Sequence, residues 1–399
     1  MRPRPARHLA LLAVALAFGV ADPAQSAELT AVLTQLQGNV TIAEAGPPRR
    51  GGAIFPVPRP ARFLQVVGRG DKVNVPAGAG AGFVCSMDRW VELSGVKDQP
   101  LSESLCLAGK PLPPGTYRRL APAAGKMISL KGVLVFEGET RGDEDEDFAI
   151  PLVLSPRRTA VLDPRPKILW TQVADATEYA IELSGPGRFL IRLDAGQVAC
   201  GERWGDAVVC SMPYPDSAPD LPPGTLSFLS VGARRGLAAP LRAEARPNRI
   251  QRLSLDKAEE VRTRLESLRN LPLDDATRGL LEADLYAHEG LFADAILAYR
   301  KALSHGDAPE IRVTLGDAYL KIGLLRLAAR TYQEVLDGTS GLAIQASAEL
   351  GLGRIEHIRR SSERAACHFR KARDLYLSVG LKEEAAAADR AARIGGGLR

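Results

Sequence analysis

The sequence predicts a multidomain protein in which an all-β N-terminal half is followed by an all-α helical array. Three observations support this class. The chain has 399 residues, which is enough for more than one domain, and 45% of them are apolar, which is enough to form packed cores. Up to about residue 250, short runs rich in β-branched residues are broken by Gly and Pro. From residue 256 on, Ala and Leu increase and apolar residues recur every three to four positions, which is the period of a helix.

Residues 1–27 have the three-part pattern of a secretory signal peptide. Three arginines precede an apolar run over residues 9–21, and small residues with Pro23 follow it. This run of about 13 residues is shorter than the roughly 20 that a helix needs to span a bilayer. We therefore expect cleavage of the segment, a periplasmic or otherwise exported protein of a bacterial envelope, and no transmembrane span in the mature chain. An uncleaved signal anchor is the alternative.

Residues 28–120 are expected to form a first β domain, with turn residues such as Gly70-Asp71 between its strands. The order GNVTI … FLQVVGRGDKVNVPAGAGAGFVCSMDRWVELSG, over about residues 30–95, resembles the FecR-like domain. That family has a Gly-x-Val strand, a Gly-Asp turn, a stretch of small residues and a strand pair ending in Val-x-Leu. The resemblance implies an envelope β domain and leaves its ligand open.

Residues 121–150 are expected to contain one more strand and an acidic linker. Five consecutive acids occupy positions 143–147. Because like charges repel one another and prefer water, this run favours a solvated loop. It has no internal Gly and does not follow the pattern of an EF-hand calcium loop, so we assign no metal site to it.

Residues 151–250 are predicted to form a β-sandwich that is similar to immunoglobulin-like or fibronectin type III-like domains. Trp170 and Tyr179 fall on neighbouring alternating strands, an arrangement in which a Trp packs under a hairpin aromatic residue. We interpret both residues as part of the core rather than as ligand contacts. The antibody spacing of Cys, Trp and Cys is missing, so only the broader class is implied.

The cysteine usage fits an oxidising compartment. Cys85 and Cys106 lie in the first β region, and Cys200 and Cys210 flank a predicted hairpin tip. Four cysteines can pair in three ways, and we favour the two local pairings because each closes a short loop. Zinc binding by the same residues lacks the usual CxxC pair. Cys367 lies in the helical region and is interpreted as a buried, small apolar residue.

Residues 256–399 contain an internal repeat that resembles the tetratricopeptide repeat. The repeated pattern is a small residue, an aromatic residue, a turn Gly, an Ala, a second aromatic residue and a small apolar residue. The third copy lacks the turn Gly, and residues 381–394 look like a capping helix. The resemblance implies pairs of antiparallel helices. The copies are centred on Ala283, Gly290 and Tyr299, on Gly316, Gly323 and Tyr332, and on Gly353, Ala365 and Phe369.

In this family, side chains from the first helix of each pair line the concave face of the array. Carried over by position, the resemblance implies a partner-binding face with charges of both signs. Such a face suits an extended peptide or the tail of a partner protein better than a nucleic acid. The residues are Asp284, His288, Glu310, Asp317, Lys321, Arg354 and His357.

The sequence contains none of the common motifs for catalysis, cofactor binding or metal binding. G-x-S-x-G, H-E-x-x-H, a Walker loop and a dinucleotide-binding glycine motif are all missing. The net charge of +5 arises from 52 basic and 47 acidic residues that are interleaved, which does not favour nucleic acid binding. We therefore predict a non-catalytic scaffold or adaptor, without a cofactor, that binds a protein or peptide through the helical array. The alternatives are a sensor that binds a glycan or peptidoglycan-related ligand through the FecR-like domain, and an enzyme of unknown chemistry.

Overall fold

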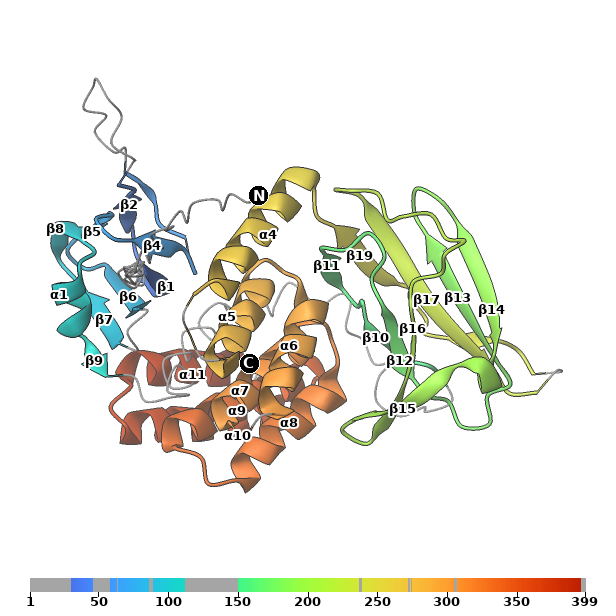
Figure 1. The fold of residues 1–399 in the computed structure, drawn as a ribbon. Helices are drawn as coiled ribbons and strands as arrows, with labels where there is room; N and C mark the ends of the chain where they lie inside the picture. The colour runs from blue at the N-terminus through green and yellow to red at the C-terminus, as the bar shows by residue number, and fades with distance from the viewer. Residues whose placement is uncertain are drawn as a thin grey trace, which may run out of the picture.

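The computed structural model describes residues 30–45, 58–62, 64–85, 89–111, 150–236, 239–271, 273, 275–304, 306 and 308–395. Strands form the N-terminal half and consecutive helices follow them (Figure 1), so the predicted fold class is confirmed. The predicted signal segment 1–27 lies outside the described residues, as do the strand and the acidic run expected before residue 150. The domain boundaries drawn from the sequence stay predictions.

The first β unit consists of the described residues between 30 and 111. Its two sheets have the strand orders β4-β1-β6-β7-β9 and β3-β2-β5-β8. Side chains from both sheets form one core, in which Leu33, Val73 and Phe83 are at most 1% exposed. The elements are β1 (Thr30–Gln37), β2 (Thr41–Ala43), β3 (Arg59–Pro60), β4 (Val66–Gly68), β5 (Lys72–Val75), β6 (Gly80–Cys85), β7 (Arg89–Leu93), β8 (Val96–Pro100), α1 (Glu103–Leu107) and β9 (Lys110–Pro111).

The second β unit consists of residues 150–252 as far as they are described. Its sheets have the strand orders β10-β12-β16-β15 and β11-β19-β17-β13-β14, with β18 paired to β17. The elements are β10 (Val153–Ser155), β11 (Thr159–Val161), β12 (Ile168–Thr171), β13 (Glu178–Ser184), β14 (Phe189–Asp194), β15 (Ala199–Trp204), β16 (Ala207–Met212), β17 (Leu226–Arg234), β18 (Arg242–Ala243) and β19 (Asn248–Arg252).

The core of the second β unit forms where its two sheets meet. Trp170 on β12 and Tyr179 on β13 are 0% and 1% exposed, and their rings meet edge to face with centroids 5.4 Å apart. The Tyr179 hydroxyl also accepts a hydrogen bond of 3.0 Å from the amide of Val173. Both aromatic residues are therefore core residues, as predicted, although their strands belong to different sheets rather than to one.

Both disulfides favoured by the sequence are present. Cys85 at the end of β6 is bonded to Cys106 in α1, and Cys200 on β15 is bonded to Cys210 on β16. The interpretation of Cys367 as a buried residue is wrong, because its side chain is exposed on the outer side of its helix. Alanines and an aromatic residue at neighbouring positions take the buried face of that helix instead.

The helical array consists of α4 (Leu255–Arg269), α5 (Asp275–His288), α6 (Phe292–Ser304), α7 (Pro309–Lys321), α8 (Leu325–Asp337), α9 (Leu342–Ile358), α10 (Ser362–Ser378) and α11 (Lys382–Gly395). The turns after α5 and α7 use Gly290 and Gly323 at φ values of 76° and 80°, a backbone region that favours Gly. The turn after α9 has Arg360 in the same region, at a φ of 61°. The missing turn Gly of the third sequence repeat is thus replaced by a residue with backbone strain.

One apolar cluster joins all three parts of the molecule. It contains Val32 and Trp90 of the first β unit, Leu154 and Trp204 of the second, and many residues of the helical array. The array lies between the two β units (Figure 1). Within the part of the chain that the structure describes, no helix is long and apolar enough to cross a membrane.

Candidate functional site

Two buried carboxylates occupy the same place in successive helix pairs. The Tyr299 hydroxyl on α6 donates a hydrogen bond of 2.5 Å to Asp284 on α5, and the Tyr332 hydroxyl on α8 donates one of 2.6 Å to Asp317 on α7. Aligned by the sequence repeat, the two hydrogen bonds are equivalent. Burial raises the pKa of Asp317 and of Tyr332 above their usual values. Each bond satisfies a buried carboxylate and ties the two helices of a pair together.

The third helix pair departs from this pattern. Arg354 stands where the first two pairs have Asp, and its Nη1 atom lies 3.7 Å from the Asp317 carboxylate of the preceding pair. The Tyr332 ring packs directly against the backbone of α9, because a Cβ atom added at Gly351 would lie 2.3 Å from that ring. Gly at this position therefore allows the second and third pairs to approach closely.

The structure separates the seven residues predicted to line a partner-binding face into two groups. Asp284, Asp317 and Arg354 are 3–7% exposed, and both carboxylates have partners inside the array. The other four keep more accessible surface: Glu310, Lys321 and His357 are half-buried, and His288 is exposed. Desolvation lowers the pKa of Lys321 and also that of the His288 imidazole, although the His288 residue as a whole keeps exposed surface. Among the seven, Asp317 and Arg354 are brought into direct contact.

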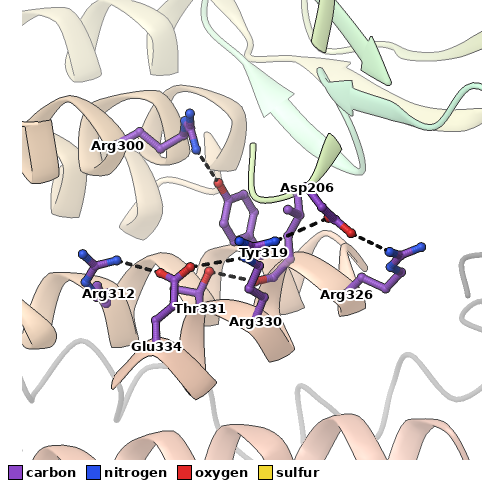
Figure 2. A network of polar contacts seen from close by, with 9 residues as sticks. Asp206, Arg300, Arg312, Tyr319, Arg326, Arg330, Thr331 and Glu334 are labelled. Atoms are coloured by element: carbon purple, nitrogen blue, oxygen red, sulfur yellow. Dashed lines mark hydrogen bonds and ion pairs between the residues drawn. The ribbon is translucent and has the colours of Figure 1, made fainter. Parts of the chain in front are cut away.

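The tip of the β15–β16 hairpin docks on α6, α7 and α8 (Figure 2). Trp204, at the end of β15, is 0% exposed, and its ring centroid lies 6.1 Å from that of Tyr319 on α7. The guanidinium of Arg300 on α6 lies over the Trp204 ring, 4.5 Å from its centroid. The turn residue Gly205 is so close to α8 that an added Cβ atom would lie 3.2 Å from Leu327. The hairpin tip is thus fitted between aromatic, aliphatic and cationic side chains.

Charged contacts surround this docked tip. Asp206 forms an ion pair of 2.8 Å with Arg326 and a longer one of 3.9 Å with Arg330. Arg300 donates to Glu202 at 3.1 Å and to the backbone carbonyl of Arg203 at 3.0 Å. Figure 2 shows how Arg330 continues the network to Glu334. The acids of the hairpin therefore meet the arginines of the helices.

A second set of contacts joins the same β unit to the turns of the array. The Arg157 side chain is 1% exposed and donates to the carbonyl of Ile322 at the end of α7, at 3.1 Å. It also forms an ion pair of 2.7 Å with Glu244 of its own unit. The amide of Ala160 and the hydroxyl of Thr159 each donate to the carbonyl of Gly290, in the turn after α5, at 3.0 Å. The turn after α5 thus binds β11, which is the terminal strand of its sheet.

The first β unit attaches through an apolar row instead. Val66, Val32, Val84 and Trp90 are cross-strand neighbours on β4, β1, β6 and β7. Val32, Val84 and Trp90 belong to the same buried cluster as Val261, Leu265 and Leu268 of α4, and Val66 packs against it. Because side chains alternate along a strand, the adjacent residues face the other way, into the core of the unit. One ion pair, between Arg62 and Glu260, accompanies this row.

These contacts join the helical array to both β units. Within the described ranges, no group of three or more His, Cys, Asp or Glu residues could hold a metal ion. Sequence reasoning identified the hairpin tip but missed its docking on α8. The 15-residue spacing of Asp and Tyr, repeated in the first two helix pairs, is a signal that could have identified the buried pairs.

Comparisons with known proteins add little. No family model matches the chain, and no curated protein matches it. Among ten matching chains of solved structure is Astrotactin-2, described as a conserved vertebrate-specific and perforin-like membrane protein involved in neuronal development. The identity is 13% and the TM-score 0.18, over 50% of this chain and 38% of that one. The present chain thus spans well under half of that protein, and a superposition this loose identifies neither fold nor function.

Proposed function

We propose that the protein is an exported, non-catalytic scaffold of a bacterial envelope that binds a protein or peptide partner through its helical array. The observation that carries the proposal is the attachment of both β units to one array of antiparallel helix pairs through a shared apolar cluster. A surface held in a fixed shape loses little conformational freedom on binding, which favours affinity. The resemblances to FecR-like and tetratricopeptide repeat proteins and the two disulfides agree with this proposal.

The partner is proposed to contact the first helices of the pairs, at the predicted positions that keep accessible surface. Glu310 lies in the first turn of α7 and Lys321 ends the helix, so the two charges lie at opposite ends of it. His357 lies in the last turn of α9, the first helix of the next pair. A row with charges of both signs fits an extended peptide that carries charges of both signs. The buried residues Asp284 and Asp317 would then support the array rather than contact the partner.

The experiment is crosslinked affinity capture from intact cell envelopes with the full-length chain. A version truncated before the array is a poor control, because it would expose the apolar row on the first β unit. We instead compare the wild-type protein with the charge reversals Glu310→Lys and Lys321→Glu. The matched controls are Glu363→Lys and Lys382→Glu, at exposed positions of α10 and α11. Thermal unfolding of each variant checks that the fold is retained.

A discrete partner that is lost with the first two variants and kept with the controls is the expected result. Retention of the partner by all four variants would contradict binding at these positions. Recovery of cell-wall material by every variant would favour the glycan-sensing alternative instead. The Trp90 side chain of the first β unit is only 9% exposed and packs in the cluster shared with α4, so it offers a sugar little surface for stacking.

A further inference from the structure

The edge strand β15 carries the residues that dock on the helices, yet its own support is weak. In its sheet β15 is the terminal strand and pairs only with β16 among the described strands. A register shift between Cys200 and Glu202 interrupts that pairing just before the docking residues begin. Beyond this bulge, Glu202, Arg203 and Trp204 all make contacts with Arg300. The hairpin tip therefore projects from an irregular edge of the sheet.

The Cys200–Cys210 disulfide closes the hairpin at this bulge. The two residues are direct cross-strand partners, and the bond spans a sequence separation of 10. The docked residues all lie within the closed loop. A disulfide at this place limits the separation of the two strands, which keeps Trp204 and Asp206 positioned against Tyr319 and Arg326.

The two disulfides of the protein differ in how far solvent reaches them. Cys85 and Cys106 are both 0% exposed. Cys210 is also 0% exposed, but Cys200 is only half-buried. Thiol–disulfide exchange requires a thiolate to reach one sulfur of the bond, so the hairpin disulfide is the one open to attack.

We propose that the Cys200–Cys210 disulfide is a redox-sensitive latch that holds the hairpin tip on α8. A dithiol reductant would open it in two steps. Its thiolate attacks Cys200 Sγ, the bond between the two cysteines breaks, and Cys210 leaves as a thiolate that takes up a proton. The second thiol of the reductant then displaces Cys200 as a thiol, and the reductant is left as its own disulfide, oxidised by two electrons. Once the strands are no longer joined, β15 separates from β16 at the bulge, and Trp204 and Asp206 leave the array.

Because of thermodynamic linkage, the proposal can be tested by changing the disulfide and by changing the docking of the hairpin tip. If the disulfide favours docking, then docking must favour the disulfide by the same factor. Reduction of the disulfide is expected to raise the equilibrium constant for undocking of the hairpin tip by on the order of 10- to 100-fold. Loss of one exposed ion pair at the tip is expected to raise the equilibrium susceptibility of the disulfide to reduction by about two- to fivefold.

The first measurement uses the full-length, folded protein and increasing concentrations of dithiothreitol. Differential alkylation with mass spectrometry follows each disulfide, and hydrogen exchange follows residues 199–212 and α8. We expect the hairpin disulfide to be reduced at least about tenfold faster than the Cys85–Cys106 bond. Faster exchange should be confined to the tip and to the part of α8 beneath it, with the strands of the first β unit unchanged. Equal reduction rates, or unchanged exchange in α8 after reduction, would overturn the proposal.

The second measurement leaves both cysteines in place, so it does not depend on the folding of a cysteine variant. Asp206→Ala removes the ion pair with Arg326, and Asp216→Ala is the matched control at a fully exposed aspartate of the same β unit. We expect Asp206→Ala to make the hairpin disulfide about two- to fivefold easier to reduce in a glutathione redox buffer. The control should match the wild-type protein. If both variants behave alike, docking and the disulfide are not coupled and the latch does not exist.

Discussion

The two β units are attached to the same helical array by different kinds of contact. The first presents a row of apolar side chains, Val66, Val32, Val84 and Trp90, to the cluster that contains α4. The second also contributes apolar side chains to this cluster, Leu154 and Trp204 among them, and it adds a buried guanidinium, backbone hydrogen bonds and ion pairs at the turns and at α8. Apolar burial is not directional, whereas hydrogen bonds fix geometry. Apolar burial therefore supplies adhesion at both units, and the added polar contacts fix the orientation of the second unit on the array.

Arg157→Ala should have the largest effect on the polar attachment. The side chain is 1% exposed and bonds to Ile322, Val153 and Glu244 at 2.7–3.1 Å. Its removal leaves buried acceptors and a carboxylate without their cationic partner, which costs about 3–5 kcal/mol. Denaturant titration of the full-length protein measures the loss. A cost below about 1 kcal/mol would show that water replaces the guanidinium, and that the polar attachment is weaker than the contacts suggest.

Asp294→Asn, beside the contact between α6 and β11, should stabilise the folded protein, and only at high pH. Asp294 lies in the first turn of α6 beside Ala293, whose amide donates to Thr159 of β11. Burial, with a smaller contribution from the charge of Asp163, raises its pKa from 3.8 to about 6. A carboxyl group whose pKa is higher in the folded state destabilises the protein when it is charged. The penalty is complete above about pH 6 and disappears below about pH 3.8.

Asp294→Asn is expected to raise the free energy of unfolding by up to about 3 kcal/mol at pH 8, which corresponds to a pKa shift of roughly two units. Near pH 3.5 the increase should be close to zero. Urea titrations at both pH values measure it. The helix N-terminus favours a negative charge and reduces the gain slightly. Asp163→Asn is the companion variant: it should reproduce a smaller part of the gain. A gain that does not depend on pH would mean that the charge of Asp294 is not the cause.

Val84→Ala tests the apolar attachment. Val84 is 2% exposed and lies between Val32 and Trp90 in the docking row. The substitution removes two buried methyl groups and leaves a cavity, which together should lower the free energy of unfolding by about 2 kcal/mol. The cost should be the same at low and high salt, because no charge is involved. Thermal unfolding in 50 mM and 1 M NaCl checks this. A cost that changes with salt would show that the Arg62–Glu260 ion pair, rather than the row, holds this unit.

The sequence repeat predicted the helix pairs well because local features determine them. Gly290 and Gly323 occupy turns that need a positive φ, and the aromatic residues of the repeat are buried between helices. The polar positions were harder to interpret. Asp284 and Asp317 look like solvated residues in a helical pattern, but tyrosines 15 residues away bury them. Such partners depend on how helices pack, which the period of a single helix does not show.

Sequence patterns did not predict how the β units dock on the array, for a related reason. The unbroken apolar run Phe83-Val84-Cys85 in β6 places apolar side chains on both faces of the strand, but it does not say what the second face covers. Trp204 beside the Gly-Asp turn was a usable signal, because a large aromatic residue at a hairpin tip needs a surface to bury it. The identity of that surface depends on contacts between segments about 100 residues apart.

The smallest expected effect belongs to the ion pair at the hairpin tip, and it distinguishes the two attachments most directly. Asp206 and Arg326 keep about half and about a third of their side-chain surface in solvent. A double-mutant cycle with Asp206→Ala and Arg326→Ala should therefore give a coupling of only about 0.2–1 kcal/mol. Unlike the cost of Val84→Ala, this coupling should fall toward zero in 1 M salt, where the screening length is about 3 Å. A coupling above about 2 kcal/mol that resists salt would mean that the tip is excluded from water when docked, and that the polar attachment supplies adhesion as well as orientation.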